Sequence, residues 1–262
     1  MSTPPHGDGR PLAGQFAAVT GGSKGIGLGI ARRFVQAGAS VMLLARDETA
    51  LAEACESLKA EVDADQEIGW LQMDTSRPES VAAGFAALAE RIPRLNIFVA
   101  NAGSGSMSPF VELSLPEWQG LVDLNLTGTF LTCQAAARRM LTEPPEDNHA
   151  ILAVSSIRAF TVLPGRVAYS ATKAAVNQLV RIAAYELAAH RIRVNALAPG
   201  ITATDITMAR VPQVFDNIGA TVPMGRAATA ADSAEAALYL CGPAGRFVTG
   251  ALLPIDGGES LV

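Results

Sequence analysis

Short apolar runs alternate with longer segments of helical periodicity along most of this chain. The first run, Phe16–Val19, leads into a glycine-containing turn and then an amphipathic stretch that continues through Phe34. Six similar runs follow: Ser40–Ala45, Ile68–Met73, Ile97–Ala100, Ala150–Ser155, Arg193–Ala198 and Leu252–Ile255. Apolar runs of this length between helical segments are typical of buried parallel strands. The pattern predicts an α/β fold, a doubly wound parallel sheet of about seven strands with helices on both faces.

The alternation predicts a single domain spanning residues 13–262, preceded by a flexible segment at 1–12. The chain has 262 residues, 49% of them hydrophobic, which is enough for one substantial core. Residues Thr142–His149 are polar and include two prolines. They predict a surface loop inside this domain, because the strand and helix pattern resumes after them.

A glycine-rich turn separates the first predicted strand from its helix. Glycines at 21, 25 and 27 would let the backbone approach a pyrophosphate, and the helix start favours phosphate charge. The spacing differs from the strict G-x-G-x-x-G pattern, so a purely structural turn is the alternative. Its place between strand and helix favours a Rossmann-type dinucleotide site. The predicted contacts in this turn are Gly21, Ser23, Lys24, Gly25, Ile26 and Gly27.

A second pattern indicates proton-transfer chemistry. Tyr169 and Lys173 are four residues apart in a predicted helix, so they share a face, and Ser156 lies thirteen residues before the tyrosine. The lysine ammonium would lower the pKa of a phenol from its usual value of about 10. A serine hydroxyl would hold a substrate oxygen against that phenol. The alternatives are an ordinary helix with a chance Tyr and Lys, and Ser155 in the serine role.

Taken in order, these motifs resemble the short-chain dehydrogenase/reductase family along nearly the whole chain. The resemblance rests on Thr20–Gly27, Asn101–Gly103, Asn125, Ser156, Tyr169–Lys173, Pro199-Gly200 and Asp256–Gly258. It implies a catalytic tetrad of Asn125, Ser156, Tyr169 and Lys173. In this family the residue matching Asn125 distorts its helix and holds a water that links the lysine to solvent. The alternative for Asn125 is a hydrogen-bonded buried amide.

The resemblance also implies cofactor contacts at the ends of later strands. Asp74, with Thr75 beside it, would accept a hydrogen bond from the adenine amino group, and Lys173 would bond the nicotinamide ribose. Further contacts are expected from Asn101, Ala102, Gly103, Tyr169, Pro199, Gly200, Thr202 and Thr204. The two threonines would reach the carboxamide, whereas Asn101–Gly103 would serve mainly to stabilise the sheet.

The second strand indicates which dinucleotide is used. Its end carries Ala45 followed by Arg46, and Lys24 precedes the second glycine of the turn. An acidic residue at the strand end would favour NAD(H), whereas two cations suit the 2′-phosphate of NADP(H). We therefore predict NADP(H). In the alternative, both cations are solvated and Asp47 turns inward to the ribose.

Charge and cysteine content exclude several classes of protein. The formal net charge of -5 and a pI near 5.3 give no basic surface for nucleic acid. Because no long apolar stretch or signal-like start is present, we expect a cytoplasmic protein without membrane partners. Cys55, Cys133 and Cys241 are scattered, which argues for free thiols and against a disulfide framework or metal site.

Two segments are expected to contact substrate. Family members usually carry small residues after the catalytic serine, but this chain has Arg158, whose guanidinium would pair with a substrate carboxylate or phosphate, with a protein acid, or remain solvated. The predicted substrate contacts are therefore Ser156, Arg158 and Tyr169. The segment Asp205–Met224, with Ile206, Met208, Val211, Val214 and Phe215, is expected to cover the pocket.

Three functions are compatible with these features. The first is an NADP(H)-dependent oxidoreductase that interconverts a ketone and a secondary alcohol, 3-oxoacyl thioesters included. The second is a non-redox epimerase or lyase that keeps its nucleotide, and the third a catalytically silent regulatory protein. The complete tetrad argues against the third. The resemblance further implies a homo-oligomer, tetramer or dimer, paired through the helices around Asn125 and Tyr169 and through the strand at Leu252–Ile255.

Overall fold

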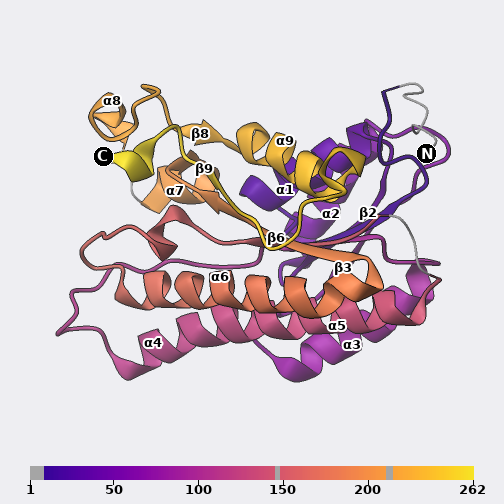
Figure 1. Ribbon diagram of the computed structural model, residues 1–262, viewed down its shortest axis with the longest axis horizontal. Coiled ribbons are helices and arrows are strands. Elements are labelled where there is room, and N and C mark those ends of the chain that lie inside the picture. Colours follow the sequence, from indigo (N-terminus) through magenta and orange to yellow (C-terminus); the bar gives the residue numbers. More distant parts are fainter. Residues whose placement is uncertain (1–8, 145–147, 211–214) are drawn as a thin grey trace.

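A parallel sheet forms the centre of the molecule (Figure 1). The computed structural model describes residues 9–144, 148–210 and 215–262. Within them, the main sheet has seven strands in the order β3-β2-β1-β4-β5-β6-β9, all parallel. The strands are β1 (Phe16–Thr20), β2 (Ser40–Ala45), β3 (Ile68–Gln72), β4 (Ile97–Ala100), β5 (His149–Val154), β6 (Ile192–Pro199) and β9 (Leu252–Ile255). Strands β7 (Thr202–Ala203) and β8 (Ala228–Thr229) pair separately.

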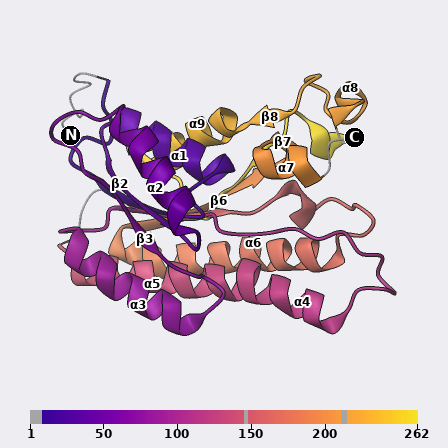
Figure 2. The same cartoon turned by 180° about the vertical axis from the view of Figure 1, so that it is seen from behind.

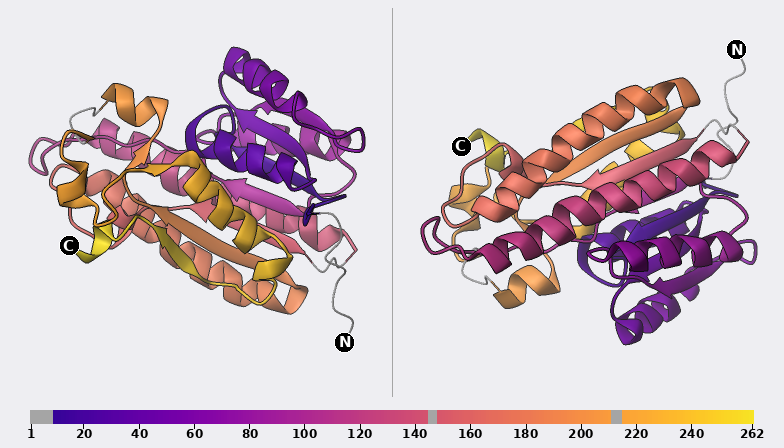
Figure 3. Two further views of the ribbon diagram at one scale, coloured as in Figure 1. Left: turned by 90° about the horizontal axis from the view of Figure 1, so that it is seen from above. Right: turned by 90° about the horizontal axis from the view of Figure 1, so that it is seen from below.

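Helices cover both faces of the sheet. One face carries α1 (Gly25–Gln36), α2 (Glu48–Lys59) and α9 (Ala230–Cys241), and the opposite face carries α3 (Pro78–Arg91), α5 (Gly128–Thr142) and α6 (Val167–Leu187) (Figures 1 and 2). Helices α5 and α6 run side by side (Figure 3). The remaining helical segments are α4 (Leu115–Leu121), η1 (Val122–Thr127), η2 (Ile157–Ala159), η3 (Ala188–His190), α7 (Asp205–Arg210), α8 (Ile218–Thr221), η5 (Pro243–Gly245) and η6 (Glu259–Leu261).

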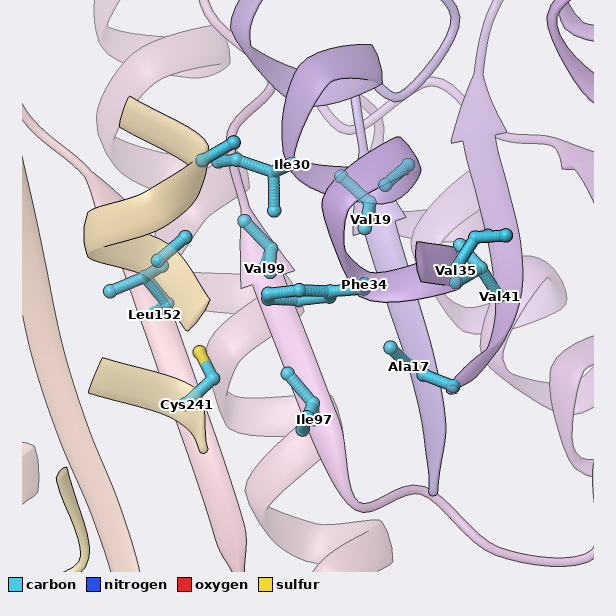
Figure 4. Packing of buried hydrophobic residues seen from close by; sticks show 14 of the residues in the cluster. Ala17, Val19, Ile30, Phe34, Val35, Val41, Ile97, Val99, Leu152 and Cys241 are labelled. Carbon is cyan, nitrogen blue, oxygen red and sulfur yellow. The ribbon is translucent and has the colours of Figure 1, made fainter. Parts of the chain in front are cut away.

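Each face of the sheet has its own apolar core. On the α1 side, Phe34 packs among Ile97, Val99 and Ile30, all fully buried (Figure 4). On the other side, helices α3, α5 and α6 contribute residues such as Val176 to a second cluster. Burying a side chain of this size contributes about 1.5–3 kcal/mol. Two buried faces explain why the strands are apolar without alternation, and they confirm the predicted α/β Rossmann-like architecture.

The predicted strands agree closely with the observed ones. Ser40–Ala45, Ile97–Ala100 and Leu252–Ile255 match to the residue, and the others differ by one residue at one or both ends. Strands β7 and β8 were not predicted, because a two-residue strand leaves no periodic signal.

The predicted surface loop Thr142–His149 is wrong at both ends. Thr142 completes α5, and His149 begins β5 with 1% of its surface exposed. The Glu143 carboxylate is also largely buried, where it accepts the Leu95 N–H at 3.0 Å and pairs with Arg139. The composition predicted exposure because the Leu95 N–H that Glu143 accepts lies 48 residues away in the sequence. Residues 145–147 lie outside the described residues.

The predicted flexible segment extends too far. Leu12 is fully buried in the core, and its N–H donates to the Ala37 carbonyl at 2.8 Å. Arg10 pairs with Asp65 at 3.0 Å. Residues 10–12 are therefore part of the domain, whereas residues 1–8 lie outside the described part of the chain.

Cys55, Cys133 and Cys241 are buried free thiols. In the described segments, no cluster of three or more His, Cys, Asp or Glu side chains could hold a metal ion. None of the helices in these segments combines the length and the apolar character that crossing a membrane requires.

Candidate functional site

The site begins where the carboxyl ends of β1 and β4 lie side by side. The Thr20 hydroxyl donates to the Val99 carbonyl at 3.2 Å and accepts the N–H groups of Asn101 and Ala102 at 2.9 and 3.0 Å. The Asn101 amide donates to the Thr20 and Gly21 carbonyls at 2.9 and 3.2 Å. These bonds join the glycine turn to Asn101–Gly103, two segments some eighty residues apart in sequence.

Backbone geometry explains the glycines of this turn. Gly21 and Gly25 have φ of +61° and +57°, which other residues adopt at a cost. A Cβ on Gly27 would collide with the Gly21 carbonyl and the Asn101 amide. The turn therefore presents bare backbone at the start of α1, whose first turn has no acidic residue. Exposed N–H groups at a helix start fit a pyrophosphate.

Lys24 and Arg46 lie at the same end of the sheet and are both exposed. The carboxylate that would favour NAD(H), Asp47, instead caps α2 by accepting the Ala50 N–H at 3.1 Å. In the alternative interpretation Asp47 would turn inward to the ribose, but its carboxylate is already engaged in this helix cap.

Asp74 follows β3, with the buried Thr75 next to it. Burial would raise the pKa of this carboxyl, but the Ser76 hydroxyl and N–H, at 2.7 and 3.0 Å, and the charges of Arg46 and Arg77 together lower it. Asp74 is consequently a firmly ionised acceptor.

Asn125 sits in η1, a π-helical turn between α4 and α5. Its side chain is fully buried, accepting the Ser104 N–H at 2.9 Å and donating to the Ser104 carbonyl at 2.8 Å. The wide turn agrees with the helix distortion that the resemblance implied. Gly103 lies between Asn125 and Lys173, since a Cβ there would be 3.1 Å from Asn125 Oδ1 and 3.5 Å from Lys173 Nζ.

The Lys173 side chain extends from α6 toward Gly103. Its buried Nζ donates to the Val154 carbonyl at 2.7 Å and lies 5.8 Å from the centroid of the Tyr169 ring. Burial disfavours the ammonium and lowers the pKa of Lys173 to about 8.

Tyr169 and Ser156 face each other across the site. Burial raises the pKa of Tyr169, while a hydrogen bond with Ser156 and the charges of Arg166 and Arg158 oppose this. We predicted that Lys173 would lower this pKa. In this structure the charges that oppose the rise are those of Arg166 and Arg158, and the Lys173 ammonium donates to the Val154 carbonyl.

The structure distinguishes the two adjacent serines. Ser155 is buried, and its hydroxyl donates to Asn177 Oδ1 at 2.6 Å. Ser156 is the N-cap of η2 and is the serine bonded to Tyr169. Ser155 therefore supports α6, and its hydroxyl has no role facing Tyr169.

Arg158 is paired with a protein acid. Its guanidinium contacts the Glu259 carboxylate, which the sequence did not single out, and bonds the Thr161 hydroxyl at 3.1 Å. This is one of the three alternatives that the sequence left open for Arg158. Glu259 could have been noticed as the charged residue directly after Asp256–Gly258.

The segment after β6 reaches back to the glycine turn. A Cβ on Gly25 would lie 3.5 Å from Thr204 Cγ2. Thr202 is buried, and its hydroxyl donates to the Gly200 carbonyl at 3.1 Å. Pro199, Gly200, Thr202 and Thr204 are thus gathered beside the predicted cofactor contacts.

Arg166 is a second residue that sequence reasoning missed. It is the N-cap residue of α6, three residues before Tyr169, and its guanidinium donates to the Ser106 carbonyl at 2.9 Å. Of the segment expected to cover the pocket, Met208 is 51% exposed in α7. Val211 and Val214, and the side chain of Ile206, lie outside the described residues.

Comparisons with known proteins agree with this geometry. A family model described as enoyl-(acyl carrier protein) reductase matches residues 21–260. A 3alpha-hydroxysteroid dehydrogenase of Mediterraneibacter gnavus is 36% identical over 246 residues, covering 94% of this chain and 97% of the relative. A rhamnolipids biosynthesis 3-oxoacyl-acyl-carrier-protein reductase of Pseudomonas aeruginosa is 34% identical over 254 residues, covering 95% and 98%.

Solved structures give the same result. A short-chain type dehydrogenase/reductase of Mycobacterium marinum superposes with a TM-score of 0.88 at 30% identity, covering 95% of this chain and 96% of the other. The NADP active-site complex of Pseudomonas aeruginosa RhlG superposes with a TM-score of 0.89 at 32% identity, covering 97% and 99%.

Proposed function

The chain belongs to the short-chain dehydrogenase/reductase family and is an oxidoreductase, and we propose that it interconverts a ketone and a secondary alcohol with NADP(H). The observation that carries this proposal is the convergence of Ser156, Tyr169, Lys173 and Asn125 at the carboxyl ends of β4 and β5. Ligands bind at that edge in open α/β sheets.

Tyr169 is the proposed acid. Its phenol is protonated at neutral pH, because burial raises its pKa, so it can donate a proton to a carbonyl oxygen that gains charge. Ser156, already bonded to the phenol, would hold that oxygen by a second hydrogen bond. In the reverse direction Tyr169 would accept the proton from the alcohol.

Lys173 and Asn125 are proposed to support this transfer. The Lys173 pKa of about 8 lets the amine exchange a proton near neutral pH. Asn125 holds the Ser104 backbone directly across Gly103 from the amine. Together they would return a proton to Tyr169 after each turnover.

The glycine turn, Asp74, Asn101–Gly103 and the segment Pro199–Thr204 fit a nicotinamide dinucleotide. Bare backbone at Gly21, Gly25 and Gly27 suits the pyrophosphate, and the ionised Asp74 suits the adenine amino group. The nicotinamide supplies or accepts the hydride when bound.

Preference for NADP(H) is supported by Lys24 and Arg46, by the use of Asp47 as a helix cap, and by the NADP complex of the Pseudomonas aeruginosa relative. Each cation would contribute about 1.5–3 kcal/mol through a charge-assisted bond to the 2′-phosphate. Lys24→Ala and Arg46→Ala are therefore expected to raise the KM for NADPH roughly 10- to 100-fold each, with little change for NADH. Equal losses with both dinucleotides, or a wild-type preference for NADH, would contradict this assignment.

The substrate class is proposed from the relatives and the rim of the site. Hydroxysteroid dehydrogenases and 3-oxoacyl-acyl-carrier-protein reductases are among the relatives. Exposed apolar side chains from the loops beside Tyr169, including Met107, Phe160 and Val162, favour a substrate with a large apolar part.

Net consumption of NADPH with a panel of ketones tests the function. The panel should contain a 3-oxoacyl thioester, a 3-ketosteroid and a small polar ketone, with alcohol products identified by mass spectrometry. Loss of NADPH with a matching alcohol supports the proposal. An isomerised product without net NADPH loss would indicate an epimerase instead.

We further propose a homo-oligomer, dimer or tetramer. Three apolar or aromatic side chains are exposed on two helices that lie side by side. They are Phe130 on α5 and Ile182 and Tyr185 on α6. Light scattering after size-exclusion chromatography should give a mass of two or four chains, and a monomer at working concentration would contradict this.

A further inference from the structure

Arg158 and Glu259 form an ion pair between residues 101 positions apart. Their side chains are 19% and 4% exposed, respectively. A carboxylate this buried requires its hydrogen-bonding capacity to be satisfied within the protein. Its contacts therefore indicate which parts of the fold depend on it.

The second Glu259 oxygen binds the segment that follows β6. Oε2 accepts the Ile201 N–H at 2.7 Å. The approach requires glycine at position 200, because a Cβ there would lie 2.6 Å from Oε2. Asp256 holds the C-terminal turn in place by accepting the N–H groups of Gly258 and Ser260 at 3.0 and 2.9 Å. Figures 1 and 2 both show the C-terminus beside α7, next to this segment.

Arg158 connects the same carboxylate to the catalytic serine. Its backbone N–H donates to Ser156 Oγ at 3.1 Å, while its guanidinium bonds Thr161 at 3.1 Å and pairs with Glu259. One residue thus orients the Ser156 hydroxyl with its backbone and reaches the C-terminal turn with its side chain. A continuous path runs from Ile201 through Glu259 and Arg158 to Ser156.

We propose that Arg158 and Glu259 are positioning residues, which fix the Ser156 hydroxyl relative to the Pro199–Thr202 backbone. The inference rests on the proposed function, in which Ser156 holds the substrate oxygen and Pro199–Thr202 holds the nicotinamide end of the cofactor. Neither side chain needs to touch the substrate. The pair sets the distance between the two halves of the site, and small errors in such a distance reduce rates strongly.

The test compares Glu259→Gln, Arg158→Met, Arg158→Lys and the double variant Arg158→Met/Glu259→Gln. Glutamine keeps an acceptor for the Ile201 N–H but loses the charge that holds Arg158. Glu61→Gln is the matched control, since Glu61, just after α2, pairs at 2.8 Å with Arg32 of α1 and neither side chain is buried. For each protein, the NADPH dissociation constant is measured by fluorescence titration and the melting temperature by calorimetry. Values of kcat and KM are measured with a neutral and an anionic ketone.

We expect Glu259→Gln and Arg158→Met each to lower kcat about tenfold or more, equally for both ketones, and to raise the NADPH dissociation constant. The double variant should lose no more kcat or NADPH affinity than the more impaired of the two single variants, because the two residues act through one interaction. Arg158→Lys should lie between wild type and Arg158→Met, since an ammonium cannot bond Thr161 and Glu259 together as a guanidinium does. Glu61→Gln should behave as wild type.

Three results would overturn the proposal. A lower melting temperature with unchanged kcat and NADPH binding would show a purely structural pair. Loss confined to the anionic ketone in Arg158→Met, with Glu259→Gln unaffected, would place Arg158 on the substrate. Fully additive losses in the double variant would show independent roles. NADPH titration needs no turnover, so it tests the role of the pair even if the protein reduces no ketone. In that case the absence of turnover would count against the proposed function and not against the role of the pair. Arg158→Lys carries the same comparisons if the methionine variants do not fold.

Discussion

Tyr169→Phe is expected to lower kcat/KM for ketone reduction by about 10³-fold while the dissociation constant for NADPH changes little. The substitution removes one hydroxyl and leaves the ring, so packing between α6 and the loop after β4 is kept. What is lost is the proton donor and the hydrogen bond with Ser156. The loss should therefore appear in the chemical step and not in cofactor binding.

Tyr185→Phe is the matched control for this prediction. It removes the same hydroxyl from the same helix, at a position that is 88% exposed. Its kinetics should equal those of the wild type. Lys173→Ala should differ from both by weakening NADPH binding as well as turnover. Retention of a substantial share of ketone reduction by Tyr169→Phe would show that another group donates the proton.

Local sequence was enough to predict the parts of the fold that depend on local pattern. Apolar runs identified each strand of the main sheet, because the central strands are buried on both faces and are mostly apolar, with Arg193 and Asn195 of β6 among the exceptions. The glycine turn was recognisable because its backbone conformations and close approaches leave no choice of residue. The order and spacing of the motifs identified the family, because each motif lies within a short stretch of sequence.

Contacts between distant segments could not be predicted. The sequence left three possible environments open for Arg158, and only the fold shows that Glu259 is its partner. No sequence pattern pointed to Arg166 as a residue near Tyr169. The surroundings of Lys173 were also not predictable. Helical spacing brings Lys173 onto the same face, but it does not reveal that the Val154 carbonyl takes the ammonium. His149 was assigned to a loop because its buried surroundings come from other elements.

Arg193 shows the same limit and gives the largest expected effect on stability. It lies in β6 with 6% of its surface exposed, where a charged residue is costly unless it is paired. Its guanidinium donates to the Leu240 carbonyl, to the Cys241 and Gly245 carbonyls at 3.0 Å each, and to Asn148 Oδ1 at 3.0 Å. It thus caps the C-terminus of α9, where a positive charge also favours the helix dipole.

Arg193→Met is expected to lower the free energy of unfolding by about 3 kcal/mol. Methionine preserves most of the buried volume, but it leaves the carbonyls at the end of α9 buried without a donor. The gain from no longer burying a cation offsets part of that cost, which is why the expected loss is smaller than the sum of the broken bonds. A change of this size should lower the melting temperature by roughly 6–12 °C in a chain of this length.

Arg246→Met is the control for Arg193→Met, because Arg246 is exposed in the same region and no side-chain hydrogen bond or ion pair holds it in the described structure. Urea and thermal unfolding of the two variants should separate clearly from each other. Arg193→Lys should recover only part of the loss, since one ammonium cannot reach acceptors on both α9 and Asn148 as a planar guanidinium does. If Arg193→Met and Arg246→Met unfolded at the same midpoint, the cap on α9 would contribute nothing, and the buried cation would have to be stabilised in another way.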